Sequence, residues 1–378
     1  MRKNCFSLSN VLPILYGLVV TALVVSTVLM AVSCKMTAEG VESIQGDMES
    51  PVLMDFSQLD ESSFELVFSE TVVLENLQIL ENDSVVCDSK AVTVENVSVS
   101  ALEGEDMQKN ACVMRASIVD STKLDLGKSF VLAGVALDQN GNSLSFGIPF
   151  YGYNDSVAGL VLSEVRADAT KAKVEFVELY VYRTGNIGGV TLYSANDDDD
   201  GEYVFPAADV KKGEYIVVHF RKLEEQSSGC IDETGSDLNF STAADSCADA
   251  RDFWVEGTEA RIGKSDVILL RERMGGKLLD CVAYAEDDVE EWKKDVFVFA
   301  ITEAEKEGVW HGGIDVSGAA SSQGITNTRT LSRQNIPQIV SAIDAGLPMP
   351  ENNASCWLLT KTSSASPGAE NSTEAYVP

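Results

Sequence analysis

Short runs in which apolar and polar residues alternate recur along most of the chain. Two of them, residues 160–165 and 174–180, are separated by a polar linker. Alternation with a period of two places every second side chain on one face of a strand, and such linkers join neighbouring strands. The stretch therefore predicts a pair of strands that opens a β-domain. Its predicted core-facing positions include Leu162, Val174, Phe176 and Leu179.

The first half of the chain after residue 50 has the same pattern. Strands are expected at Phe64–Phe68, Ala91–Val99 and around Cys112, followed by a hairpin from Phe130 that turns at Asn140–Gly141. No helical period of useful length interrupts them. Residues 52–156 are therefore predicted to form a small β-sandwich.

The second half adds strands near 190–194, 202–205 and 211–220, then the clearest hairpin, 265–284, which turns at Gly275–Gly276. A polar excursion, Arg221–Asp252, separates the third strand from the hairpin. Short helices are expected at 287–294, 302–307 and 337–345. The sequence thus predicts an all-β chain of two tandem sandwiches with short helical inserts in the second, residues 157–371, before a tail, 372–378.

Two basic residues precede a long apolar segment, Val11–Val32, that ends in small residues before Cys34. That order is typical of a secretory signal peptide, predicted here over residues 1–33. The residues Ala-Val-Ser-Cys ending at Cys34 resemble the lipobox of bacterial lipoproteins, with Ala31 where that family prefers Leu. The resemblance implies cleavage before Cys34 and a lipid on its thiol.

An uncleaved anchor is the alternative, because the apolar segment is long enough to span a bilayer. Lys35 slightly favours the outer membrane, since the Asp that retains many lipoproteins at the inner membrane is absent. Residues 34–51 have no apolar period and are expected to form a flexible tether. The predicted localisation is the bacterial cell envelope, with the lipid as the membrane contact and the exposed face left open.

The charge balance argues against nucleic acid. The chain has 59 acidic and 28 basic residues, a net charge of -31, and the basic residues form no sustained run. Such a surface repels a phosphate backbone. The expected partners are therefore the membrane and, at the cell surface, a protein or a glycan.

Six cysteines remain after Cys5 and Cys34, an even number that is typical of disulfides in an exported protein. Pairing within each predicted domain favours Cys87 with Cys112, Cys230 with Cys247, and Cys281 with Cys356. Six cysteines allow fifteen connectivities, so the pairing stays open.

Two resemblances to known families follow. Residues 66–70 and 134–144 resemble the first strand and last hairpin of bacterial immunoglobulin-like domains. Residues 159–371 resemble a bacterial lamin-tail domain, an immunoglobulin-like β-sandwich. The matching residues are LSEV at 162–165, EFVELY at 175–180, FPAADVKKGEYIVV at 205–218, DVILLRERMGGKLLDCVAY at 266–284, TLSR at 330–333, and the closing CW and SPGAEN.

Candidate chemistry is sparse. Glu175 and Glu178 are three apart and so face opposite sides of a strand, which favours structural roles over a shared catalytic site. His219 and His311 lack partner ligands at metal spacing. Asp198 and Asp200 lie in an acidic loop, but Ala207 stands where a calcium loop needs a bidentate Glu. These aspartates are therefore weak metal candidates, and the sequence favours a solvated hairpin tip over a metal site.

Among the tryptophans, Trp310 and Trp357 are expected in the core. Trp254 and Trp292 lie in polar inserts and could be exposed, so a binding surface is expected near them and in the 221–252 segment. No nucleophile elbow, P-loop or dinucleotide motif occurs. We therefore expect a non-catalytic interaction, adhesion or scaffolding protein without a cofactor. The alternatives are an accessory or catalytic part of a nuclease or phosphoesterase system, because bacterial lamin-tail domains occur beside such domains, and a solute-binding lipoprotein.

Overall fold

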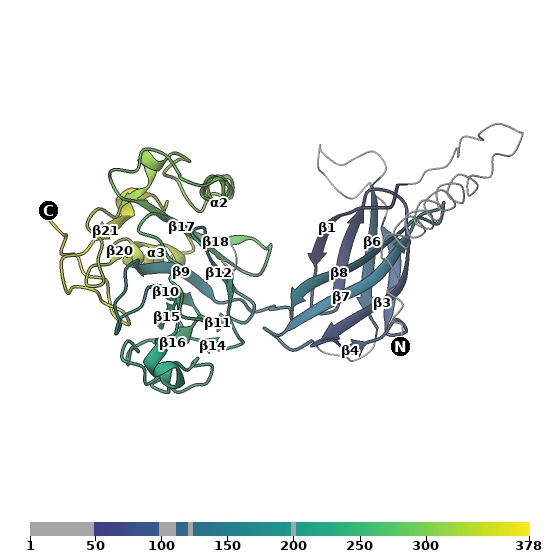
Figure 1. The fold of residues 1–378 in the computed structure, drawn as a ribbon, viewed down its shortest axis with the longest axis horizontal. Helices are drawn as coiled ribbons and strands as arrows, with labels where there is room; N and C mark the ends of the chain where they lie inside the picture. Colours follow the sequence, from purple (N-terminus) through teal and green to yellow (C-terminus); the bar gives the residue numbers. More distant parts are fainter. Residues whose placement is uncertain (1–48, 98–110, 120–123, 198–201) are drawn as a thin grey trace, which may run out of the picture. The chain divides into compact units, whose positions relative to one another are not determined.

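The computed structural model describes residues 49–97, 111–119, 124–197 and 202–378 (Figure 1). The predicted signal peptide and Cys34 lie outside these residues. The described chain is built mainly of strands, with two short α-helices, which confirms the all-β expectation. Within the described ranges, no helix is both long enough and apolar enough to cross a membrane.

The first pair of sheets lies between residues 53 and 151. Both sheets have four strands, in the orders β1-β2-β6-β5 and β4-β3-β7-β8. The strands are β1 (Leu53–Gln58), β2 (Ser63–Phe68), β3 (Val73–Glu81), β4 (Ser84–Cys87), β5 (Val92–Val97), β6 (Cys112–Ile118), β7 (Ser129–Leu137) and β8 (Ser143–Tyr151).

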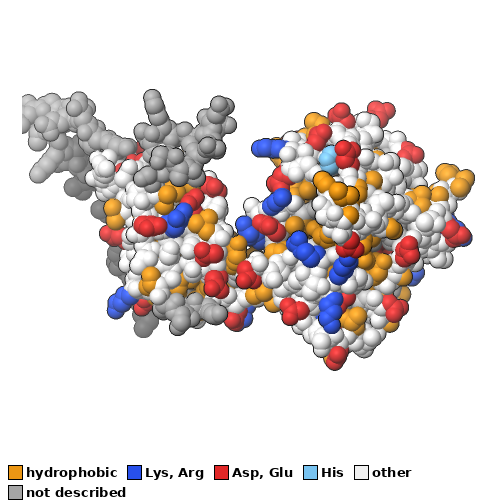
Figure 2. Space-filling model, turned by 180° about the vertical axis from the view of Figure 1, so that it is seen from behind, with side chains coloured by type: hydrophobic (Ala, Val, Ile, Leu, Met, Phe, Trp, Pro, Cys, Tyr) orange, Lys and Arg blue, Asp and Glu red, His pale blue; other side chains and the backbone are white. Residues whose placement is uncertain are grey.

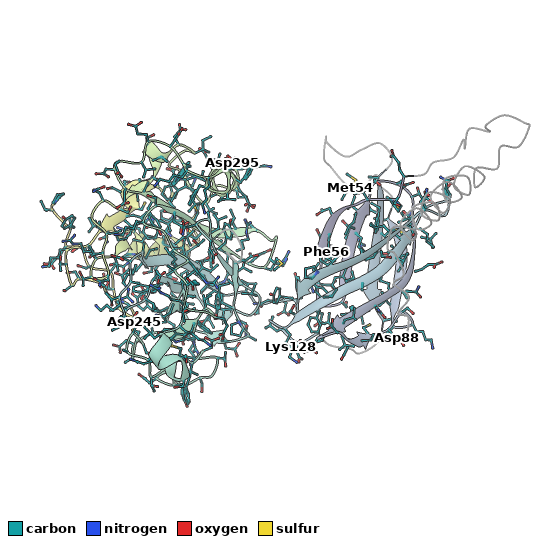
Figure 3. All side chains as sticks on the ribbon, viewed as in Figure 1. Met54, Phe56, Asp88, Lys128, Asp245 and Asp295 are labelled. Atoms are coloured by element: carbon teal, nitrogen blue, oxygen red, sulfur yellow. The ribbon has the colours of Figure 1, made fainter. Side chains whose placement is uncertain are left out.

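Alternate residues of these strands form one shared core. Phe64 and Leu66 of β2 are buried together with Ile79 and Leu132 from the other sheet. The ring of Phe64 meets that of Phe150 edge-on, with centroids 5.0 Å apart, and Phe56, labelled in Figure 3, lies 6.1 Å from Phe64. Side chains from both sheets therefore interdigitate in one core, as expected for packed sheets.

The second pair of sheets follows. A six-stranded sheet has the order β16-β15-β10-β9-β20-β21, and a five-stranded sheet has the order β13-β12-β17-β18-β19. The strands are β9 (Gly159–Arg166), β10 (Phe176–Arg183), β11 (Gly185–Asn186), β12 (Thr191–Ser194), β13 (Glu202–Val204), β14 (Asp209–Val210), β15 (Tyr215–His219), β16 (Arg251–Trp254), β17 (Asp266–Arg271), β18 (Leu278–Ala285), β19 (Ala320–Ser321), β20 (Leu331–Arg333) and β21 (Trp357–Leu359).

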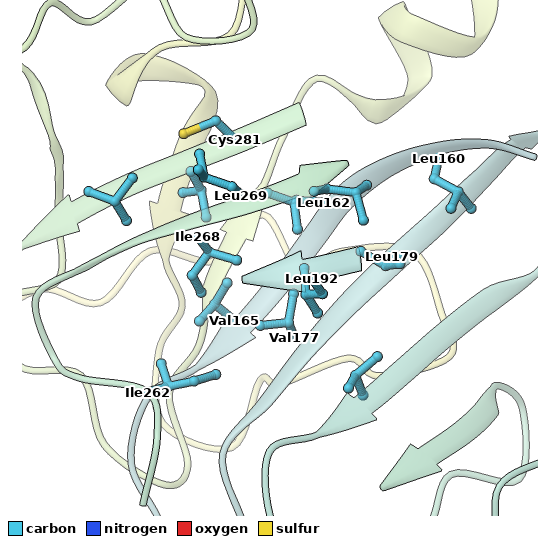
Figure 4. Close-up of a cluster of buried hydrophobic side chains, with 14 of the residues drawn as sticks. Leu160, Leu162, Val165, Val177, Leu179, Leu192, Ile262, Ile268, Leu269 and Cys281 are labelled. Atoms are coloured by element: carbon cyan, nitrogen blue, oxygen red, sulfur yellow. The ribbon is translucent and has the colours of Figure 1, made fainter. Parts of the chain in front are cut away.

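The core between these sheets is apolar. Figure 4 shows Leu162 and Leu179 from the six-stranded sheet beside Leu192 and Ile268 from the five-stranded sheet, and all four are fully buried. The predicted pair 160–165 and 174–180 is the antiparallel pair β9 and β10, with Val177 opposite Val165.

Both faces of the six-stranded sheet are buried, which corrects one expectation. Leu162 and Leu179 face the main core, but Phe176 and Val174 belong to separate clusters away from it. Phe176 and Leu179 are three residues apart in a strand, so their side chains point to opposite faces. Where a segment covers the outer face, the residues on that face are also apolar. The sequence pattern then does not show which face points to the main core.

Both predicted hairpin turns are present. β7 and β8 are joined across Gly141, which has a φ of 89°, and β17 and β18 across Gly275, with a φ of 64°. Glycine adopts such positive φ values without steric cost. These turns set the register of their strands, as expected from the sequence.

The helix predictions were partly wrong. The helix expected at 337–345 is α3 (Ile336–Asp344). The helix expected at 302–307 is the second half of α2 (Asp295–Lys306), which begins seven residues earlier than predicted, and 287–294 is not helical. In α2 the buried residues are Phe297, Ala300, Ile301 and Ala304, a helical spacing. Its β-branched and aromatic start conceals that period, because the same residues are common in strands.

The segment 221–252 is ordered in the structure. Its last residues begin β16, which pairs in parallel with β15. The buried Glu233 accepts hydrogen bonds from the N–H groups of Phe240, Ser241 and Asp252, at 2.7 to 3.1 Å. One acidic side chain therefore organises this polar segment.

Candidate functional site

Two tyrosines from adjacent strands form the floor of a groove on the outer face of the six-stranded sheet. Tyr180 of β10 lies directly opposite Tyr215 of β15 in the antiparallel register. Their ring centroids are 5.2 Å apart and the rings are inclined at 64°, an edge-to-face arrangement. Both side chains are half-buried. A directly opposed aromatic pair stabilises the sheet and presents a ring surface to solvent.

Helix α3 forms one wall of this groove. Pro337 occupies its first turn, where a missing N–H is harmless. Ile339 is the buried residue of the helix, whereas Val340 and Ser341 are at least partly exposed. The helix therefore uses one side to pack on the protein and leaves Ile336, Pro337 and Val340 along the groove.

The C-terminal segment forms the opposite wall and is attached to the sheet by two buried glutamates. Glu164 of β9 accepts hydrogen bonds from the N–H of Ser366 at 3.1 and 3.2 Å. Glu178 of β10 accepts one from the N–H of Gly368 at 2.6 Å. The amide of Asn371 then donates to the carbonyl oxygen of Ser163 at 3.0 Å. The chain is thereby fixed where it passes the tyrosines.

The last residues are also paired with the sheet rather than free. The N–H of Tyr376 donates to the carbonyl of Leu359 at 2.8 Å, and that of Lys361 donates to Glu374 at 2.9 Å. The predicted tail, residues 372–378, thus forms part of the same edge.

The groove has a volume of about 810 Å³. This volume lies within the range of small-molecule and peptide sites. Its lining residues are Ser163, Tyr180, Tyr215, Arg333, Gln334, Ile336, Pro337, Val340, Ser341, Asp344, Ala345, Glu370, Asn371 and Thr373. We call it the α3 groove.

Burial raises the pKa values of the titratable groups beneath the α3 groove. Burial raises the pKa of Glu164, and raises that of Glu178 well above its ordinary value, with the nearby Glu164 charge adding to the second shift. The pKa of Tyr215 is raised to about 12 by burial and by the negative charge of Glu178. Burial therefore favours the uncharged forms of all three groups beneath the floor.

A second polar cluster lies further along the same face. Nε2 of His219 is 2.8 Å from Asp252, and the His219 ring stacks on Trp254 with centroids 3.8 Å apart. Arg166 pairs with Asp245, labelled in Figure 3, and its guanidinium lies 4.5 Å from the Phe176 ring centre. His219 is 1% exposed. His219 is thus a buried structural residue, whereas His311 is exposed.

The acids singled out in the sequence have structural partners. Glu175 pairs with Arg221 at 2.7 Å and accepts from the N–H of Arg261, whereas Glu178 bonds to Gly368. Each contacts backbone or an ion-pair partner within the protein, in line with the structural roles favoured by the sequence. Asp198 and Asp200 lie outside the described residues. Elsewhere in the described chain, no group of three metal-binding side chains comes together.

The predicted exposure is wrong for Trp254, whereas Trp292 is partly exposed. Trp254 is 2% exposed, because it belongs to β16 and its Nε1 donates to Ser241 at 3.0 Å. Trp292 is partly buried, stacks on Phe297 and donates to the carbonyl of Ile314. Trp310 and Trp357 lie in the core, as predicted.

None of the three predicted disulfides is formed in the structure. The thiol of Cys112 contacts the Met114 sulfur, that of Cys230 the carbonyl of Gln226, and that of Cys247 the carbonyl of Pro367. An even cysteine count does not determine which sulfurs the fold brings together. The pairs Cys87 with Cys112, Cys230 with Cys247, and Cys281 with Cys356 stay predictions.

Sequence reasoning missed the α3 groove because its lining comes from segments between residues 163 and 373. The 221–252 segment, where a surface was expected, borders a smaller pocket of about 340 Å³, lined by Lys171, Arg221 and Lys222 among others. The available signal for the groove was the partly apolar sequence of α3. The sequence does not show which side of α3 is exposed, because that follows from the buried position of Ile339 in the structure.

Comparisons with known proteins match this part of the chain. A 196-residue stretch is 33% identical to an uncharacterized protein of Treponema pallidum (strain Nichols), covering 50% of this chain and 49% of the relative. The chain therefore matches about half the length of this curated relative. No solved structure matches. The family model TP_1001_2nd, described as "protein second domain", matches residues 158–359, just over half of the chain, and the chain therefore belongs to that family.

Proposed function

We propose that this chain is a non-catalytic, lipid-anchored protein of the bacterial envelope that binds a ligand in the α3 groove. The observation that carries the proposal is the groove itself. It is open, has an aromatic floor of Tyr180 and Tyr215, and lies largely within the matched second domain. Concave sites lined by aromatic and apolar groups with a few polar atoms are the usual ligand sites of proteins.

The buried acids support a binding role over catalysis. Glu164 and Glu178 hold backbone N–H groups of the C-terminal segment, and Asp280 pairs with Arg333 and accepts from the N–H of Leu162. All three carboxyl groups are buried and bonded within the protein, so they have little access to a substrate for proton transfer. These acids maintain the groove.

We also propose that both sheet pairs are immunoglobulin-like sandwiches, the second of the lamin-tail type. The packed four-stranded sheets and the six-on-five arrangement support this reading. On it, the α3 groove is an elaboration of the six-stranded sheet, and function lies in what covers that sheet rather than in the sandwich.

A ligand screen tests the binding function. The full chain is heated with a panel of metabolites, saccharides and peptides, and a true ligand raises the melting temperature. Ser341 is exposed on α3 and lines the groove, so Ser341→Trp should fill it and abolish the shift while the ligand-free melting temperature stays the same. A shift that survives Ser341→Trp places the ligand elsewhere.

A solute-binding lipoprotein is the second candidate, because a volume of about 810 Å³ accommodates a free metabolite. Metabolites that stabilise the chain would favour this role, whereas a response to macromolecules alone would favour adhesion or scaffolding.

The proposed anchor has its own test. Cys34→Ala should abolish labelling by a palmitate analogue, because the lipid is carried by that thiol. Unchanged labelling contradicts lipidation at Cys34. Protease or antibody access on intact cells then distinguishes a surface-exposed protein from a periplasmic one.

The surface charge supports a partner other than nucleic acid. On the face shown in Figure 2, Lys and Arg side chains are interspersed with Asp and Glu side chains, and the chain carries a net charge of -31. We expect no DNA band shift at low salt. Salt-sensitive binding would overturn this expectation.

A further inference from the structure

The accessible charges of the α3 groove are negative. Asp344 and Glu370 are both exposed and line the groove from two segments, α3 and the C-terminal segment. Among the described residues, Glu370 has no ion-pair partner, and Asp344 pairs only with the exposed Lys212. The single cation in the lining, Arg333, is 1% exposed and pairs with the buried Asp280. A ligand entering the groove therefore meets two carboxylates, one of them uncompensated.

The floor and the α3 wall suit an aliphatic chain that ends in a cation. The faces of Tyr180 and Tyr215 carry the negative part of the ring quadrupole, which attracts ammonium and guanidinium groups. Ile336, Pro337 and Val340 offer apolar surface beside them. Lys and Arg side chains have this combination of an apolar stem and a charged end.

Asn371 attaches the C-terminal wall of the groove to the sheet. Its Nδ2 donates to the carbonyl oxygens of Ser163 and Arg333, at 3.0 and 2.8 Å. Its Oδ1 is buried and has no donor among the described residues. This oxygen is enclosed by the protein, so Asn371 contributes to the groove by fixing the wall that carries Glu370 rather than by contacting a ligand through Oδ1.

We propose that the α3 groove binds a basic peptide segment, with Arg or Lys side chains lying over the tyrosine pair and reaching Asp344 and Glu370. The inference rests on the proposed binding function and names its ligand class. A peptide fits better than a free amine, because the two carboxylates lie on different walls and the volume of about 810 Å³ exceeds the needs of one side chain. The strongly acidic chain favours a cationic partner before contact is made.

Fluorescence anisotropy with a labelled peptide, Gly-Leu-Arg-Leu-Arg-Gly, tests this proposal on the full chain. The peptide should bind about 25-fold more tightly than its Gln-for-Arg counterpart, as expected for two charged contacts near a surface that contribute about fivefold each. A Glu-for-Arg peptide should not bind, and N-acetyl-arginine amide should bind more weakly than the peptide. Higher salt should weaken binding.

Charge-neutral variants localise the contact. Asp344→Asn and Glu370→Gln should each weaken peptide binding about fivefold, and together about 25-fold, since one exposed ion contact contributes up to about a fivefold effect. Glu374→Gln is the matched control. Glu374 lies in the same segment but outside the groove, where it pairs with Lys361. The control should bind like the wild type, and all variants should keep its melting temperature.

The outcomes separate the two levels of the proposal. Equal binding of the Arg and Gln peptides, abolished by Ser341→Trp, would overturn the cationic class and leave the groove as a binding site. Tighter binding of free N-acetyl-arginine amide than of the peptide would overturn the peptide assignment. If no peptide binds and no compound in the ligand screen shifts the melting temperature, both the ligand class and the binding function fail.

Discussion

The carboxylate of Glu178, buried on a central strand of the six-stranded sheet, accepts a hydrogen bond of 2.6 Å from the backbone N–H of Gly368. The contact joins residues 190 positions apart and fixes the wall of the α3 groove that carries Glu370 and Asn371. A fully buried acid therefore determines where the C-terminal segment lies.

Glu178→Ala should lower the free energy of unfolding by about 2–4 kcal/mol, because it leaves a buried N–H without an acceptor and creates a cavity. Glu178→Gln keeps an acceptor oxygen and should cost much less. Urea denaturation measures both. Equal losses in the two variants would show that the hydrogen bond to Gly368 is not the stabilising contact.

Asp266 predicts a dependence of stability on pH. It is fully buried and accepts from Ser194 Oγ at 2.7 Å and from the N–H of Val267 at 2.8 Å. Burial is the main cause that raises its pKa from 3.8 to about 7. Because the folded pKa is the higher one, folding favours the protonated form. This stability is present below pH 3.8 and is lost as the pH rises through 7.

The loss from this group is on the order of 4 kcal/mol. Asp266→Asn removes the titration but also removes acceptors for backbone N–H groups. The variant should be clearly less stable than the wild type at pH 5, and the difference should shrink or reverse at pH 8. Denaturation at both pH values measures it. Parallel stability curves for the two proteins would contradict a titration of Asp266 in this range.

The parts of the fold that the sequence predicts are those with local signals. Gly141 and Gly275 mark hairpins because a positive φ is required at those turns. The strand Arg251–Trp254 was missed, because it is short, pairs in parallel with a distant strand and follows a polar segment. Its Trp254 is buried by His219 and Ser241, contacts that local pattern does not reveal.

The candidate site depends on still longer connections. A structural role was expected for Glu178, but its partner, the backbone N–H of Gly368, and the matching contact of Glu164 with Ser366 follow only from the tertiary structure. Tyr180 and Tyr215 become neighbours through strand register. The alternation of a strand specifies which face each tyrosine occupies and leaves open what covers that face.

Arg333 and Asp280 form a buried ion pair in which both side chains are almost fully inaccessible. Arg333→Met removes the cation and leaves Asp280 buried without it, which should cost about 3–5 kcal/mol. The double variant Arg333→Met with Asp280→Leu should recover part of this loss. Recovery stays incomplete, because Asp280 also accepts from Leu162 and Asn352.

A double-mutant cycle in urea measures the coupling between Arg333 and Asp280. Additive effects of the two single substitutions would contradict a stabilising pair. Leu279→Ala serves as a control for general disturbance of β18. Leu279 precedes Asp280 in the sequence, and its side chain is only partly buried.

The reactivity of Cys281 tests whether this cysteine is a free thiol, as in the structure, or part of a disulfide, as expected from the sequence. The side chain is fully buried in the core, and burial raises the thiol pKa well above its ordinary value. The thiolate is the reactive form, so iodoacetamide should label Cys281 only after the chain is unfolded, without any reductant. Mass spectrometry of the peptides measures the labelling.

A disulfide between Cys281 and Cys356 would give a different result, since neither residue would be labelled in the unfolded chain until a reductant is added. Cys356→Ser supplies the control. If both thiols are free, this substitution leaves the labelling of Cys281 unchanged, because the Cys356 thiol contacts the carbonyl of Glu351 instead. If the disulfide forms, the substitution makes Cys281 reactive in the unfolded, unreduced chain. Labelling of the peptide that contains Cys281 therefore shows whether the core cysteine is a free thiol or part of a disulfide.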